Sequence, residues 1–178
     1  MNNTKKVKSE FFEWIIMIIV AIVLALIIRY FILSSTLVNG SSMEPTLKTN
    51  DRLLVNRISF MIDDLEYGDI VEFHNPNNEK EDFIKRVIAT EGDTVEIKNN
   101  IVYVNNQPLN ENYTSTENGF TTFGAESYWE IEKDEVFVLG DNRPNSNDSR
   151  AFGPIKKDSI VGIAFFRFYP FSKIGLLK

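Results

Sequence analysis

Three segments of the chain carry residue types suited to hydrolytic chemistry, and the first is residues 38–47, Val-Asn-Gly-Ser-Ser-Met-Glu-Pro-Thr-Leu. Gly40 permits backbone angles that other residues avoid, and Pro45 fixes φ at about −65° and lacks an N–H donor. A backbone held in this way can present the hydroxyl of Ser42 outward as a nucleophile. A run of this composition is also typical of a plain loop, so the segment by itself leaves both interpretations open.

A serine nucleophile needs a base, and two basic side chains are candidates. His74 is the only histidine and ends a strand-like run, where a solvated side chain is the commoner outcome. The other candidate lies in residues 82–88, in which Phe83, Lys85 and Val87 would share one face of a strand. Burial of Lys85 among these apolar neighbours would lower its pKa from about 10.4 and leave a neutral amine. Such an amine can take a proton from a serine hydroxyl, so we interpret Lys85 as the better base.

The opposite face of the same strand would carry Ile84, Arg86 and Ile88. A lysine on the solvent face, with Arg86 buried or paired instead, fits the alternation equally well. The pattern alone does not separate the two arrangements.

The third segment, residues 140–154, is dense in turn-forming residues and reads Gly-Asp-Asn-Arg-Pro-Asn-Ser-Asn-Asp-Ser-Arg-Ala-Phe-Gly-Pro. A surface loop is the simplest interpretation. The segment fails the pattern of a calcium-binding EF-hand loop, because Arg143 occupies the third position, where Asp or Asn is required. Its carboxylates and guanidinium groups could instead fix a loop by paired hydrogen bonds.

The composition excludes several classes of site. The 178 residues carry a net charge of −6, which argues against a nucleic-acid-binding protein, since such proteins normally show a basic patch. No cysteine is present, which excludes thiol catalysis, disulfides and cysteine-ligated metals, and a single histidine excludes a histidine-rich metal site. The lack of cysteine does not identify the compartment, because disulfides are optional in a domain of this size.

The elements that must position these side chains begin with an apolar segment. No polar side chain occurs in residues 15–28, and three lysines within residues 5–8 precede it. A membrane span needs about 20 mostly apolar residues, and the positive-inside rule places the lysines in the cytoplasm. We therefore predict a cytoplasmic tail at 1–10, a transmembrane anchor helix at 11–33 and an extracytoplasmic domain at 34–178.

Two alternatives for the apolar segment are weaker. A cleaved signal peptide would have a shorter apolar region ending in a small-x-small site, whereas residues 30–33 are the bulky Tyr-Phe-Ile-Leu. A buried soluble helix would normally be apolar on one face, whereas this segment is apolar on every face. An uncleaved anchor is favoured.

The rest of the chain is rich in strand signals and shows no helical period after residue 35. Asn99 and Asn100 tolerate positive φ, so they predict a two-residue hairpin, whereas residues 109–127 are polar and predict an exposed loop or insertion. The outer domain is expected to be mainly β, with strands too irregularly spaced for a clean sandwich. Runs of strand-forming residues occur at 52–56, 69–73, 82–88, 94–98, 101–104, 135–140 and 159–168.

Taken in order, these segments resemble those of the type I signal peptidases, the membrane-anchored serine proteases with a Ser/Lys dyad, and most closely their single-span Gram-positive form. Four features match: the anchor, the box at 40–47, the box at 84–88 followed by 91–93, and the box at 140–150. One box alone is weakly specific, but all of them in this order are highly specific and cover nearly the whole chain. The resemblance implies a signal-peptidase-like catalytic domain of irregular antiparallel sheet behind the transmembrane helix.

Carried to these positions, the resemblance implies roles for individual residues. Ser42 would be the nucleophile and Lys85 the general base, while the hydroxyl of Ser146 would help to orient the lysine. The positions that match the shallow pockets for small substrate residues are Val38, Met43, Leu47, Phe83 and Ile84.

The resemblance also implies supporting ion pairs. Asp148 and Arg150 would pair near the site, and Asp141 with Arg86 would steady the same loop. One position departs from some members of the family, in which a serine two residues before the nucleophile assists the oxyanion. That position is Gly40 here, as it often is in single-span forms, so we do not interpret it as loss of activity.

The implied reaction is hydrolysis of one peptide bond in a secreted preprotein, after a small-x-small site, with the substrate extended along a sheet edge. The implied partners are signal peptides, membrane lipid and, as a candidate, the secretion translocon, without nucleic acid, metal or organic cofactor. Two rivals remain. A Ser/Lys autoprotease of a regulator is disfavoured by the span, and a membrane-tethered β module that binds without cutting is disfavoured by the joint presence of Ser42 and Lys85.

Overall fold

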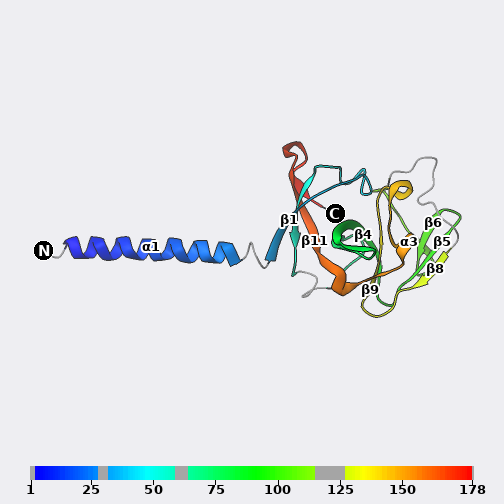
Figure 1. Cartoon of the computed structure of the whole chain (residues 1–178), viewed down its shortest axis with the longest axis horizontal. Coiled ribbons are helices and arrows are strands. Elements are labelled where there is room, and N and C mark those ends of the chain that lie inside the picture. Colours follow the sequence, from blue (N-terminus) through cyan, green and yellow to red (C-terminus); the bar gives the residue numbers. More distant parts are fainter. Residues whose placement is uncertain (1–2, 28–31, 59–63, 115–126, 178) are drawn as a thin grey trace.

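A computed structural model describes residues 3–27, 32–58, 64–114 and 127–177. The 25-residue helix α1 (Asn3–Ile27) extends away from a β-rich body that contains the C-terminus (Figure 1). The side chains of residues 12–26 on this helix are exposed. Of the helices in the described ranges, none combines the length and the hydropathy that a membrane crossing requires.

The larger sheet begins with strands that flank the predicted nucleophile. β1 (Leu33–Leu37) pairs with β2 (Arg52–Asn56), and the nucleophile segment runs between them. β11 (Ile160–Tyr169) lies on the other side of β2, followed by β3 (Ile70–Asn75) and β4 (Asn78–Thr90). The predicted base lies on β4, at the centre of this sheet.

Two further strands complete the sheet at the edge opposite β1. β9 (Glu135–Leu139) pairs with β4 and β10 (Ile155–Lys156) pairs with β9, so the order is β1-β2-β11-β3-β4-β9-β10, with β12 (Gly175–Leu176) beside β11. Every one of these pairs is antiparallel, and register shifts interrupt β11 and β4. The expected irregular antiparallel sheet is therefore present in the described residues.

A smaller sheet has the order β7-β6-β5-β8. It consists of β5 (Thr94–Lys98), β6 (Ile101–Val104), β7 (Gln107–Pro108) and β8 (Ser127–Glu130). The predicted hairpin between β5 and β6 is confirmed, because Lys98 pairs with Ile101 and both intervening asparagines have positive φ, 50° and 61°. Short helical turns occur at α3 (Ser149–Phe152), Arg143–Asn145, Lys157–Ser159 and Phe171–Lys173.

Each run that the sequence predicts as a strand coincides with a strand of the structure. The pattern misses β1 and β8, together with the two-residue strands β7, β10 and β12. Two serines in β1 are weak strand formers, and pairing with β2 imposes the extended conformation. β8 (Ser127–Glu130) directly follows the polar run that predicts a loop, and its extended form is imposed by pairing with β5.

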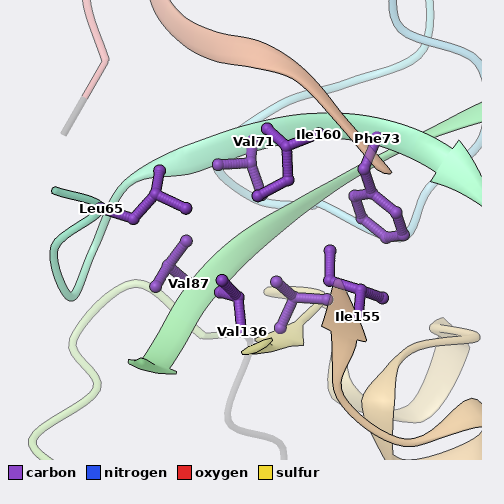
Figure 2. Packing of buried hydrophobic residues seen from close by; sticks show 8 residues of the cluster. Leu65, Val71, Phe73, Val87, Val136, Ile155 and Ile160 are labelled. Atoms are coloured by element: carbon purple, nitrogen blue, oxygen red, sulfur yellow. The ribbon is translucent and has the colours of Figure 1, made fainter. Parts of the chain in front are cut away.

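The central core explains why the base is buried. Figure 2 shows Val71 and Phe73 of β3 and Val87 of β4 pointing toward the same apolar cluster as Val136 and Ile155. Phe83 packs against this cluster from the same face of β4. Since side chains alternate along a strand, Lys85 projects from β4 on this face, between Phe83 and Val87. Each buried apolar side chain contributes about 1.5–3 kcal/mol by transfer from water.

Residues 109–114 run close to the body. The N–H of Leu109 donates to the carbonyl of Val102 at 2.8 Å, and Glu111 and Thr114 are buried. The prediction of an exposed loop is therefore wrong for these two buried residues. The rest of that predicted loop up to β8, residues 115–126, lies outside the described residues.

Candidate active site

Lys85 and Ser42 meet although 43 positions separate them in the chain. The Nζ atom of Lys85 lies 2.9 Å from the Oγ atom of Ser42, and it donates a second hydrogen bond to the carbonyl of Ile84 at 3.0 Å. Lys85 pairs with Val71 across the β3–β4 ladder, and Ser42 follows the end of β1. A base and a hydroxyl at this separation can exchange a proton directly.

The environment of Lys85 favours the neutral amine. The residue is 3% exposed, and burial lowers its pKa to about 8, against the opposing charges of Asp148 and Asp141. None of the ion pairs formed within the described ranges includes Lys85. The solvent-facing alternative for Lys85 is thus excluded, and an appreciable share of the amine is unprotonated near neutral pH.

The turn that carries Ser42 is held by hydrogen bonds from two other segments. Asn142 donates its N–H to the carbonyl of Ser42 and its side-chain amide to the carbonyl of Ser41, each at 3.0 Å. The hydroxyl of Thr49 donates to the carbonyl of Gly40 at 3.0 Å. Gly40 has a φ of 100°, where a side chain would be strained, and this accounts for glycine in place of the serine of some family members.

Arg86 and Asp141 form a buried, two-pronged ion pair. Nε and Nη2 of Arg86 donate to the two carboxylate oxygens of Asp141 at 2.9 and 2.8 Å, and Nη1 donates to the carbonyl of Gly68 at 2.9 Å. The hydroxyl of Thr46 donates to Asp141 at 2.5 Å. Asp141 thereby joins β4 to the end of the nucleophile turn, and the pairing expected from the resemblance is present.

The second expected ion pair stabilises the loop after β9. Nε and Nη2 of Arg150 each donate to the carboxylate of Asp148 at 2.8 Å, and Nη2 also donates to the carbonyl of Arg143 at 2.7 Å. Asp148 caps helix α3 and accepts the N–H of Gly140 at 3.0 Å. This network holds the loop after β9 in place beside Ser42.

Ser146 does not make the hydrogen bond expected of it. Its hydroxyl is buried and has no hydrogen-bond partner within the part of the chain that the structure describes. The side chain packs against Gly140, where an added Cβ would lie 2.6 Å from the Cβ of Ser146 and 2.5 Å from the carbonyl oxygen of Ser42. Glycine is therefore required for the loop to approach the nucleophile turn, and the orienting role of Ser146 stays a prediction.

A cleft of about 260 Å³ runs past Ser42 and Lys85. Of the predicted pocket residues, Val38, Met43, Phe83 and Ile84 line it. The remaining lining residues are Thr36, Leu37, Asn39, Gly40, Ser41, Glu72, Asp82, Asn145 and Asn147.

Leu47 and His74 lie elsewhere. Leu47 is fully buried in the cluster that contains Val38 and Met43, so it supports the cleft from below and does not line it. The prediction of a direct substrate contact is wrong for Leu47. His74 is half exposed on β3, with Nδ1 2.7 Å from Asp82, and does not line the cleft.

Sequence reasoning missed a residue that supports the loop from outside the matching boxes. Both terminal nitrogens of Arg143 donate to the carboxylate of Glu111, and Nε of Arg143 donates to the carbonyl of Gly140 at 2.9 Å. Tyr113 donates to the same carboxylate at 3.2 Å and lies under the guanidinium of Arg86, 4.1 Å from it. No local sequence signal marks Glu111, because its partner lies 32 positions away.

Within the described residues, no group of three or more histidine and acidic side chains is arranged to hold a metal ion.

Comparison with known proteins agrees with this geometry. Residues 11–169 match the family model described as signal peptidase, peptidase S26. The chain belongs to the signal peptidase family S26. A curated relative, signal peptidase IB of Staphylococcus aureus, is 42% identical over 180 residues, covering 93% of each chain. The probable signal peptidase I-1 of Synechocystis is 40% identical, covering 93% of this chain and 86% of its own.

Among solved structures, a crystal structure of a signal peptidase I from Enterococcus faecalis V583 matches 57% of this chain and 97% of that chain, with 31% identity and a TM-score of 0.49. Membership of the signal peptidase family makes the chain a serine peptidase. The non-catalytic binding module is therefore the weaker interpretation.

Proposed function

We propose that this signal peptidase is a membrane-anchored endopeptidase that removes signal peptides from secreted preproteins, with Ser42 as nucleophile and Lys85 as general base. The observation that carries the proposal is the 2.9 Å separation of Lys85 Nζ and Ser42 Oγ, with the lysine buried and beside a cleft. A hydroxyl becomes an effective nucleophile only when a nearby group accepts its proton.

The reaction divides into two steps that use the same proton acceptor. Neutral Lys85 takes the proton of Ser42 while Oγ attacks the scissile carbonyl, and the resulting ammonium returns a proton to the leaving amine. An ester on Ser42 remains. Lys85 then takes a proton from water, hydroxide attacks the ester, and the proton returns to Ser42. The backbone N–H of Ser42 is a candidate donor to the developing oxyanion.

The cleft suits an extended chain with small side chains. Its apolar lining by Val38, Met43, Phe83 and Ile84 leaves shallow space beside Ser42. We infer that alanine-like side chains occupy the first and third positions before the cut, because side chains two residues apart share one face of an extended chain.

Membrane anchoring rests on the N-terminal sequence. Fourteen consecutive residues, 15–28, lack polar side chains, and the lysines at 5–8 precede them. The side chains of residues 12–26 on α1 are exposed in the described chain. We propose that this segment holds the catalytic domain at the outer membrane face, where preproteins emerge, with lipid and the translocon as neighbours.

The activity is tested by incubating the purified full chain in detergent with a preprotein that carries an Ala-x-Ala site. We expect one cut after the second alanine, and loss of that cut in Ser42→Ala. Cleavage by a Ser42→Ala protein would contradict the assigned nucleophile, and no cleavage by the wild type would contradict the function.

The topology is tested by adding a protease to intact protoplasts. The proposed orientation predicts that the C-terminal domain is digested from outside. Survival of that domain until lysis would show that the orientation is reversed.

A further inference from the structure

One polar group in the cleft has no part in the proposed reaction. Glu72 of β3 lines the cleft, yet the residue is only 5% exposed. Its neighbours across the ladders are Ile84 of β4 and Gly162 of β11, neither of which has a charge to offer. A carboxylate in the central strand of a sheet is costly to desolvate, and apolar residues normally occupy such positions.

Thr36 indicates which end of the cleft this carboxyl occupies. The hydroxyl of Thr36 on β1 forms a side-chain hydrogen bond with it. Thr36 and Val38 are two residues apart on one extended run, and both line the cleft. Glu72 therefore lies at the Thr36 end, one side-chain repeat beyond Val38 in the direction away from the Ser42 turn.

Charged groups of both signs act on the carboxyl at this end. Asp82 lines the same part of the cleft and pairs with His74, which is exposed. Burial raises the pKa of Glu72, Asp82 raises it further, and the opposing effects come from the Thr36 hydrogen bond, Arg57 and His74. Water hydrates this carboxyl poorly, so a hydrogen bond from a substrate group would be more favourable here than at the surface.

We propose that Glu72 is a specificity-determining residue, which selects a side chain with a hydrogen-bond donor at the third residue before the cut. The proposal rests on the function proposed above. In an extended substrate the first and third residues before the cut lie on one face, about 6.6–7 Å apart. The first contacts the apolar lining beside Ser42, and the third reaches Thr36 and Glu72. The hydroxyl of a serine or threonine side chain there donates a hydrogen bond to the Glu72 carboxylate.

A site built to accept a hydrogen bond discriminates against a substrate that lacks the donor. Such a substrate covers the Glu72 carboxyl from water and offers no hydrogen bond beyond the one from Thr36. Valine and threonine have nearly the same shape, so this pair of substrates separates hydrogen bonding from size. The structure thus predicts a preference that the apolar residues of the cleft would not produce.

The test compares two preproteins that differ only at the third residue before the cut, threonine or valine, and measures kcat/KM for each. The ratio of the two values is taken within each enzyme variant, so a general loss of activity cancels. Relative to the wild type, Glu72→Val should lower the threonine-to-valine ratio by roughly tenfold. Glu72→Gln, whose amide oxygen still accepts a hydrogen bond, should retain a ratio above that of Glu72→Val.

Glu130→Val is the matched control, because Glu130 is exposed on β8 in the smaller sheet. Its ratio should equal that of the wild type. An unchanged ratio in both Glu72 variants, with the Ala-x-Ala preprotein still cut, would overturn this inference alone. If the wild type cut none of the three preproteins, the proposed function would fail and this inference with it.

Discussion

Lys85 and Arg86 are neighbours on β4 with nearly the same burial, yet their pKa values shift in opposite directions. Lys85 is 3% exposed and meets a hydroxyl and a carbonyl, so burial lowers its pKa to about 8. Arg86 is 2% exposed; burial by itself would lower its pKa, but the hydrogen bonds and charge of Asp141 outweigh burial and raise it. Burial alone therefore does not decide whether a cation stays charged, since the partner that the fold supplies decides it.

The difference between the two pKa shifts suits the two roles, proton transfer by Lys85 and carboxylate binding by Arg86. An ammonium loses its proton within the accessible pH range when desolvated, whereas a guanidinium stays protonated and binds a carboxylate with two parallel hydrogen bonds. One face of β4 thus carries the reactive group and the other carries the group that stabilises the loop around it.

The largest expected effect comes from removing the reactive member of the pair. Lys85→Met keeps the apolar stem without the amine, so we expect kcat/KM to fall by roughly 10³- to 10⁴-fold. Lys85→Arg should be equally inactive, because a guanidinium accepts no proton at workable pH. The unfolding temperature of Lys85→Met should be unchanged or higher, since no buried carboxylate loses a partner. Activity within tenfold of the wild type would remove Lys85 from the mechanism.

Whereas Lys85→Met lowers the activity of the protein, Arg86→Met should lower its stability. It leaves the fully buried carboxylate of Asp141 without a cation, which costs about 3–5 kcal/mol of unfolding free energy. Denaturant titration measures this loss. Lys156→Met serves as control, because its pair with Glu135 involves an exposed lysine, and solvent screens such a pair. Equal stability of Arg86→Met and Lys156→Met would mean that the buried pair does not stabilise the loop.

Gly140 connects the loop after β9 to the Ser42 turn. Its N–H donates a hydrogen bond to Asp148, and an added Cβ would meet the carbonyl oxygen of Ser42. Gly140→Ala should displace the Ser42 turn and lower kcat by about 100-fold, as small misplacements of reacting groups do. The matched change Gly175→Ala should leave kcat unaffected, because an added Cβ there meets no atom within 4 Å. Similar rates for the two variants would show that the turn tolerates the displacement.

The pH dependence of activity and of stability tests whether Lys85 reacts as a neutral amine. Since Lys85 must be neutral, kcat/KM should fall about tenfold per pH unit below its pKa of about 8. The folded pKa lies below the unfolded value, so the unfolded chain binds more protons between them, and stability should rise from about pH 8 to 10.5. In Lys85→Met this rise should be smaller. A wild-type profile flat from pH 6 to 9 would contradict the neutral lysine.

His74→Ala should have the smallest effect. The imidazole is 51% exposed, pairs with Asp82 and does not itself line the cleft, so we expect kcat/KM to change less than about threefold. Processing of the Ala-x-Ala preprotein measures it. Loss of activity in a folded His74→Ala protein would return the histidine to the mechanism.

Most of the strands and the matching boxes could be predicted from the sequence, because alternation and turn residues are local signals. The hairpin at Asn99 and Asn100 is an example, since positive φ is a property of the residues themselves. β1 was missed because its extended form depends on its partner β2. Local signals favoured Lys85 over His74 as the base, but they did not decide whether Lys85 or Arg86 faces solvent.

The sequence by itself determined which side chains were available: one histidine, no cysteine, and serine and lysine in recognisable surroundings. It also determined that Lys85 and Arg86 would face opposite ways, because strand alternation is geometric. Only the tertiary structure decided that both faces are buried, that Asp141 pairs with Arg86, and that Glu111 supports Arg143. Desolvation and pairing depend on atoms from distant segments, and these quantities set the charge of a lysine and the position of its serine.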